Sequence, residues 1–272
     1  MPETDPKSAS LRDEAYEVLK TRIISMGLQP SVRLDQARLE RELGLGRTPI
    51  REALLRLSAE NLVEVNHNHG FTVKPLTLKD ASDLFEALLT MERFSARLAA
   101  QHITPAELRA LETGYGRIQA AIEREDYLRI TLANSLLHRQ IAAASHNRFV
   151  QMFLETLHDQ AQRLAYISFS RPLGRRTLKE NFQRAQHDHR QIIQCLSKRD
   201  AEGVDEIMTA HTLAFRSRIQ AFLESQPAEE FRWKLAGPFA SARTPSGEAS
   251  KRRRGPTLRA TTQLDHDEFA LS

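Results

Sequence analysis

The chain has 272 residues, of which 40% are hydrophobic and 27% are charged, a composition typical of a folded protein with two domains. No uncharged apolar run approaches the roughly 18 residues that a membrane span needs, and the polar first ten residues are unlike a secretory signal, so the cytoplasm is the expected location. The single cysteine, Cys195, argues against a disulfide framework and is expected to be a buried, inert thiol.

Residues 11–26 and 34–43 are each predicted to form a helix. Apolar residues recur at helical spacing through the first segment, whereas residues 1–10 lack such a pattern and are expected to be flexible. The second segment ends at Gly44, a residue suited to the left-handed conformation that often closes a helix. A tight turn is therefore expected directly after this helix.

The next helix is expected to have Thr48 as its cap and Pro49 at its first helical position. Burial of its apolar stripe leaves Arg47 and Arg51 pointing outward. Helix, tight turn and capped second helix in this order predict a helix-turn-helix that presents the two arginines to a DNA duplex. The stripe recurs at positions i, i+3, i+4 and i+7 and comprises Ile50, Ala53, Leu54 and Leu57.

Residues 62–65 and 71–74 are predicted to be strands joined by the turn-rich residues 66–70, which together make a β-wing. Two histidines, His67 and His69, lie in this turn. Gly70 permits a close approach of the backbone, so His69 and Gly70 are expected to contact the DNA backbone or minor groove. The alternative is that these histidines are ordinary turn residues.

This stretch, roughly residues 11–75, resembles the winged helix-turn-helix of the GntR family of bacterial transcription regulators. The resemblance implies a DNA-binding domain in which Arg47, Thr48 and Arg51 contact DNA. Ala37 stands where an arginine often reaches DNA in the family, and the neighbouring Arg38 is expected to contact the DNA backbone instead. The resemblance rests on Gly27-Leu28-Gln29-Pro30, Leu34, Leu43-Gly44-Leu45, the run from Arg47 to Leu54, Leu57 and Gly70.

Residues 77–225 are expected to be entirely helical. Thr104 and Pro105 provide a cap and a first-turn proline for one of the helices. Six amphipathic helices of this length predict a bundle, so the expected fold class is mainly α, with an N-terminal winged helix-turn-helix and a C-terminal all-helical bundle. The predicted helices span residues 80–101, 105–124, 127–144, 148–169, 178–196 and 201–223.

Three histidines, His138, His189 and His211, fall on the apolar stripes of three different predicted helices, and Asn134 precedes His138 by about one helical turn. A buried polar group is costly unless it is bonded, and imidazoles that converge from separate helices are a common way for a bundle to bind a metal ion. The alternative for each is a core histidine bonded to a neighbour. His158 is able to approach the same cavity.

The helical region resembles the FCD effector domain of FadR-type GntR regulators, and Asn134, His138, His189 and His211 match the metal-binding pattern of that domain. The resemblance implies a divalent metal ion such as zinc, nickel or manganese, a small-molecule effector such as an organic acid, and a homodimer. Leu88 stands where the family frequently carries an arginine that holds an acid, so a more apolar effector stays open.

Together these patterns predict a sequence-specific DNA-binding transcription regulator, acting as a repressor on a pseudo-palindromic double-stranded operator, with affinity controlled by the effector. One alternative is a metal-dependent enzyme that uses the three histidines, although no acidic general base is evident on their stripes. Another is an architectural DNA-binding protein without an effector. Residues 233–272 hold a surplus of three positive charges out of the total of +4 and are expected to be a disordered basic tail.

Overall fold

The computed structural model describes residues 6–66, 70–171 and 177–224, and this part of the chain is mainly helical with one small sheet, as predicted. The wing histidines His67 and His69 and the tail 233–272 lie outside the described residues. Within the described ranges, every helix is either too short or too polar to cross a lipid bilayer.

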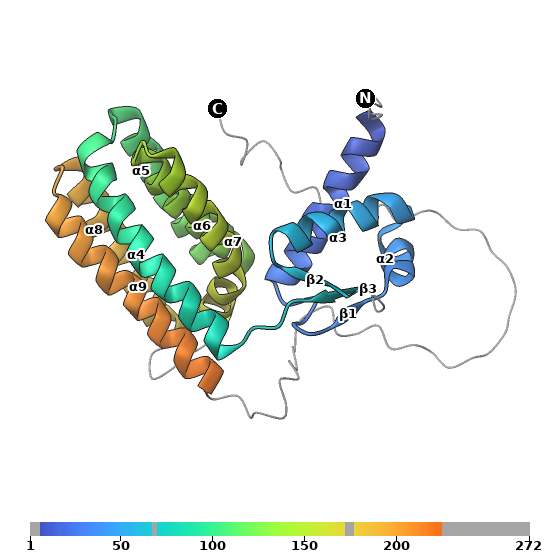
Figure 1. Cartoon of the computed structure of the whole chain (residues 1–272). Coiled ribbons are helices and arrows are strands. Elements are labelled where there is room, and N and C mark those ends of the chain that lie inside the picture. The colour runs from blue at the N-terminus through green and yellow to red at the C-terminus, as the bar shows by residue number, and fades with distance from the viewer. Residues whose placement is uncertain (1–5, 67–69, 172–176, 225–272) are drawn as a thin grey trace, which may run out of the picture. The chain divides into compact units, whose positions relative to one another are not determined.

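The described part of the winged region contains three helices (Figure 1). The first, α1 (Pro6–Ile24), starts inside the segment predicted to be flexible, so residues 6–10 are helical. The second, α2 (Gln36–Leu43), is capped by the side chain of Asp35 and ends at Gly44, whose φ of 67° is the left-handed conformation expected there.

The predicted cap at Thr48 is wrong. Helix α3 (Arg47–Ala59) starts two residues earlier than expected, and Gly46 takes the N-cap position with an extended backbone and no side-chain cap. The physical reason is the turn after Gly44, which lets the helix start at Arg47 without a capping hydroxyl. As a result Arg47 belongs to the first turn of α3 rather than to the loop before it.

The sheet contains one strand that the pattern did not predict. β1 (Arg33–Leu34) joins β3 (Gly70–Val73), which also pairs with β2 (Val63–Asn66), in the antiparallel order β1-β3-β2. Leu34, expected to start a helix, lies instead opposite Phe71 in β1. Two residues are too few for any periodicity, so only the pairing with the wing reveals this strand.

The predicted apolar stripe of α3 is buried completely, with each of its side chains 0% exposed. It packs against α1 and the inner face of the sheet to form the core of the winged region. Burial of one face of α3 fixes the direction of its opposite face. The buried residues of this core include Leu19, Ile23, Ile50, Leu54, Leu57 and Phe71.

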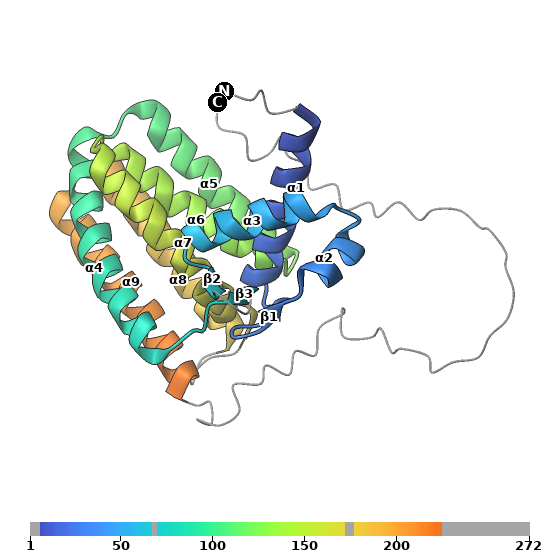
Figure 2. The ribbon, with the colours of Figure 1, turned by 45° about the vertical axis from the view of Figure 1, so that its right-hand side comes forward.

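The helical region is a bundle of six described helices, in agreement with the predicted number and nearly with the predicted limits. α4 and α9 lie side by side in both views, and α6 packs between α5 and α7 (Figures 1 and 2). The helices are α4 (Leu78–His102), α5 (Pro105–Glu123), α6 (Tyr127–Ala144), α7 (Arg148–Ser170), α8 (Leu178–Ser197) and α9 (Ala201–Glu224).

Side-chain caps define where several of these helices begin. The predicted cap of α5 is confirmed, because Thr104 and Glu107 form a reciprocal capping box with Pro105 in the first turn. α8 begins with a second capping box, formed by Thr177 and Glu180. Such local signals set helix limits independently of the packing in the bundle.

Cys195 on α8 is half-buried rather than buried, so that part of the prediction is wrong. Its helix face borders the core instead of entering it, with Leu196 taking the fully buried position. Burial still raises the pKa of the Cys195 thiol, which disfavours the reactive thiolate.

Candidate metal centre and nucleic-acid interface

The outer face of α3 carries Arg47 and Arg51, and both side chains are exposed as predicted. Because the stripe from Ile50 to Leu57 anchors the opposite face, the two arginines are held on a rigid element. Among the described residues neither guanidinium forms a hydrogen bond or an ion pair. Two guanidinium groups on one helix face that have no partner within the described residues can bind phosphates or the edges of guanine bases.

The other residues predicted to contact DNA have different surroundings. Thr48 is exposed beside Arg47 and is free of a capping role. Arg38 on α2 is exposed, but its Nε lies 2.6 Å from Glu42 Oε1, so a phosphate has to compete with this carboxylate. Gly70 has a φ of 77° at the start of β3, while His69 lies outside the described residues.

A hollow connects the N-terminal turn of α3 with the wing. It brings Arg47 and Gly70 together with Arg33, an exposed residue of β1 that the sequence patterns did not single out. No local signal marks Arg33, because its place depends on the antiparallel pairing with Thr72. The hollow also contains acidic groups, and its lining comprises Arg33, Leu34, Asp35, Gln36, Ala37, Glu40, Arg47 and Gly70.

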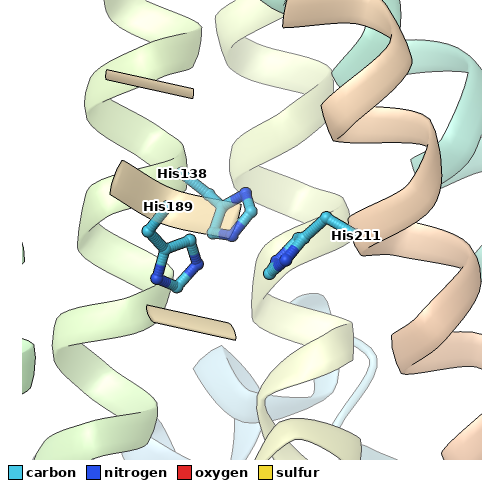
Figure 3. Close-up of side chains that lie close together, drawn as sticks. All are labelled: His138, His189 and His211. Atoms are coloured by element: carbon cyan, nitrogen blue, oxygen red, sulfur yellow. The ribbon is translucent and has the colours of Figure 1, made fainter. Parts of the chain in front are cut away.

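In the bundle, the structure brings together the three histidines that were predicted to converge (Figure 3). Their ring centroids are 5.6 Å apart for His138 and His189, 5.4 Å for His138 and His211, and 4.8 Å for His189 and His211. One ring nitrogen from each lies within 4.8 Å of the others, which makes the three a candidate metal site. The side chains come from α6, α8 and α9.

Burial favours the neutral, metal-binding form of His189 and His211. Burial lowers the pKa of His189 well below its usual value, and it lowers the pKa of His211 even though Asp188 favours the charged form. A neutral imidazole has a lone pair available for a cation. Both ring nitrogens of His189 are buried without a hydrogen-bond partner, which is costly unless a ligand occupies them. The donor set therefore fits a borderline divalent ion.

Asn134 is half-buried and lines the same cavity as His138 and His211, so the fourth predicted ligand faces the site. The cavity has a volume of about 40 Å³, enough for an ion and a few waters. Leu88 and Arg218 also line it. Arg218 from α9 supplies a cation near the position where Leu88 lacks one, and the sequence patterns did not single it out.

One expectation about the site is wrong: acidic residues do accompany the histidines. Glu92 on α4 is 6% exposed, and its Oε1 lies 2.7 Å from His138 Nδ1 and 3.2 Å from His158 Nε2. Asp188 Oδ2 lies 3.3 Å from His211 Nδ1. Helical periodicity places Glu92 on the same face as the buried Phe85 and Leu88, but only the packing of α4 on α6 and α7 brings it to the histidines.

Two further helices thus add polar groups to the three histidines: Glu92 on α4, which the sequence patterns did not single out, and His158 on α7, which was expected to be able to approach the cavity. His158 on α7 is buried, and burial lowers its pKa although Glu92 opposes this. For Glu92, burial by itself raises the pKa, but His138 and His158 outweigh it and hold the carboxyl well below its usual range. His187, two residues from His189 on α8, is exposed.

Comparison with known protein families assigns both regions. Residues 11–73 match the bacterial regulatory proteins of the gntR family, and residues 83–214 match the FCD domain. Both matches lie in the regions for which the sequence patterns predicted DNA binding and effector binding.

Individual relatives agree with these matches. The HTH-type transcriptional regulator McbR of Escherichia coli is 30% identical over 151 residues, covering 56% of this chain and 68% of McbR. The HTH-type transcriptional repressor GlaR of Escherichia coli is 28% identical over 205 residues, covering 74% of this chain and 91% of GlaR. The solved structure of E. coli McbR/YncC has a TM-score of 0.65 at 22% identity, covers 77% of this chain and 96% of that chain, and shows a similar fold.

Proposed function

Because this chain belongs to the GntR family of bacterial transcription regulators and carries an FCD domain, we propose that it is a repressor controlled by a small effector. The effector binds beside a divalent metal ion in the bundle and changes the affinity for a specific operator. The name of GlaR, a transcriptional repressor, supports the direction of the effect. The chain acts in the cytoplasm, where the bacterial chromosome is accessible.

The exposed arginines of α3 are the observation that carries DNA recognition. Arg47 and Arg51 lie on a helix whose other face is locked in the core, and both guanidinium groups are available to a ligand. In this proposal they contact base edges in the major groove, while Thr48, Arg38 and the wing at His69 and Gly70 contact the backbone or the minor groove. Each arginine pair with a guanine contributes about 1–3 kcal/mol of discrimination.

A pseudo-palindromic operator requires two copies of the winged region, so the proposed active species is a homodimer. The first turns of α7 provide support for this assembly. Phe149, Met152 and Phe153 lie close together in sequence on that helix and are 55%, 58% and 61% exposed. Large apolar side chains gathered on a surface are typical of a protein–protein contact.

The proposed metal ligands are His138, His189 and His211, with the amide oxygen of Asn134 as a fourth. Unpartnered ring nitrogens and neutral imidazoles support this assignment, and zinc, nickel or manganese-like ions suit the donor set. A bound ion supplies open positions for a carboxylate of the effector, and Arg218 faces the same cavity as a second anion-binding group. The small volume of the cavity favours a small organic acid.

The effector controls DNA binding only if it binds differently to the DNA-competent and DNA-incompetent arrangements of the protein. The same coupling free energy then appears as weaker effector binding to the operator complex. A purely architectural DNA-binding protein lacks this reciprocity, so operator titrations with and without an organic acid separate the two functions.

The decisive experiment selects genomic DNA fragments on the purified full chain and repeats the selection with Arg51→Ala. We expect the unmodified protein to enrich a pseudo-palindromic sequence and Arg51→Ala to lose roughly 10- to 100-fold of specific affinity in an anisotropy titration. Arg117→Ala serves as the matched control, because it removes an exposed arginine from α5. Failure of the unmodified chain to enrich any sequence contradicts the proposed function.

A further inference from the structure

Glu92 lies at the centre of a second group of metal-binding side chains in the bundle. Its carboxylate, the ring of His138 and the ring of His158 come from α4, α6 and α7, and each residue is 6% exposed. One ligand atom from each lies within 4.8 Å of the other two. This group shares His138 with the three-histidine group but otherwise uses different residues on different helices.

The contacts of Glu92 place one carboxylate oxygen between two buried ring nitrogens. Oε2 accepts a hydrogen bond of 2.8 Å from Thr212 Oγ1, which fixes the carboxylate. Oε1 lies 2.7 Å from His138 Nδ1 and 3.2 Å from His158 Nε2. Neither nitrogen makes a directed hydrogen bond despite this short separation. Three possible metal ligands, one oxygen and two nitrogens, thus lie close together in the interior.

The buried negative charge of Glu92 also favours a bound cation. A carboxylate buried to this extent is costly unless a cation or several hydrogen bonds compensate it, and Thr212 provides one such bond. The two imidazoles beside it, from His138 and His158, bring nitrogen donors to the same carboxylate. A divalent ion would compensate the negative charge of Glu92 and would bind the unpartnered nitrogens of His138 and His158. At the other group, Asn134 supplies only a neutral amide oxygen.

We propose that Glu92, His138 and His158 form a second position for a divalent metal ion in this cavity, with Glu92 as its anionic ligand. This inference rests on the proposed metal-containing cavity and extends it. A neutral His138 offers a lone pair on only one of its two nitrogens at a time, so the two positions are alternatives for one ion. The tautomer of His138 decides which position the ion occupies.

Three forms of the full-length protein test the proposal. The first carries His189→Gln and His211→Gln, which removes the three-histidine group but keeps Glu92, His138 and His158. The second carries Glu92→Gln and His158→Gln, which does the reverse. The third combines all four changes. Glutamine keeps the interior polar and close in size, and circular dichroism of each metal-free variant checks that its helix content is unchanged.

Each form is loaded with Co²⁺, dialysed, and examined by elemental analysis and by its visible absorption spectrum. We expect the unmodified chain and both partial variants to bind cobalt, with different spectra because one site contains a carboxylate oxygen and the other mainly nitrogen. The combined variant is expected to bind none. Adding Glu92→Gln alone to the first variant should also abolish its binding, since that isosteric change removes the anionic ligand.

The outcomes separate this inference from the proposed function. If the unmodified chain binds cobalt and the first variant binds none, the second position does not exist although the three-histidine site stands. The same conclusion follows if Glu92→Gln leaves cobalt binding by the first variant unchanged. If the unmodified chain binds no metal ion, both the inference and the metal component of the proposed function are wrong.

Discussion

The polar functional groups at the start of α3 are exposed to water, whereas those of the helical bundle are buried in its interior. At α3, the functional groups Arg47 and Arg51 are exposed to water, and the apolar stripe on the opposite face is buried in the core. In the bundle, the functional groups Glu92, His138 and His189 are themselves part of the interior. Exposed charges cost little in the free protein, whereas buried ones remain costly until a ligand compensates them.

This difference predicts where a mutation affects function alone and where it also affects folding. Changes to the arginines are expected to alter DNA affinity with little effect on stability, because surface substitutions usually stay within about 0.5 kcal/mol. Changes to the buried cluster are expected to alter ligand binding and stability together. Three further changes, taken from the largest expected effect to the smallest, sharpen the contrast.

Leu54→Ala tests the support beneath the arginines. Leu54 is 0% exposed in the core of the winged region, so its truncation is expected to cost about 2–5 kcal/mol of that region's stability. Hydrogen exchange measured by mass spectrometry should show faster exchange in α3, together with weaker operator binding. Metal binding by the bundle should persist in this variant. Unchanged exchange in α3 would show that the stripe is not what holds the arginines in place.

Metal-dependent stabilisation tests the buried cluster. A metal ion at 100 times its dissociation constant is expected to stabilise the folded chain by about 2.7 kcal/mol, because it binds the folded state alone. His138 belongs to both candidate groups, so His138→Gln should remove the upward shift of the unfolding temperature that Zn²⁺ or Ni²⁺ produces in calorimetry. The exposed His187→Gln on α8 is the matched control. If the metal raised the unfolding temperature equally in the unmodified protein, His138→Gln and His187→Gln, the role of His138 as a ligand would be contradicted.

The smallest expected effect lies at a position outside both sites. Thr104→Ala removes the capping hydroxyl of α5, and we expect it to destabilise the chain by about 1 kcal/mol. Denaturant unfolding followed by circular dichroism measures this change. Operator affinity and metal affinity should equal those of the unmodified protein. Loss of either function would mean that α5 is coupled to a site more tightly than the comparison of the two regions implies.

The ends of the bundle helices were predictable within a few residues, because local sequence signals mark them. Periodicity marks the buried face, and local caps such as Thr104 mark the first turn. The same reasoning identified the stripe of α3 and the outward direction of Arg47 and Arg51. It placed the cap at Thr48, two residues too late, since a glycine can start a helix without any side-chain signal.

The sequence by itself determined the helix-turn-helix, the bundle and the inward direction of His138, His189 and His211, because periodicity and capping are local properties of the chain. Only the tertiary structure decided that Arg33 joins the wing and that Glu92 and His158 face His138. Those placements depend on which helices and strands pack together and on how far each is shifted along its axis relative to its neighbour. A one-dimensional pattern records which side of a helix is buried, but not which neighbour it meets.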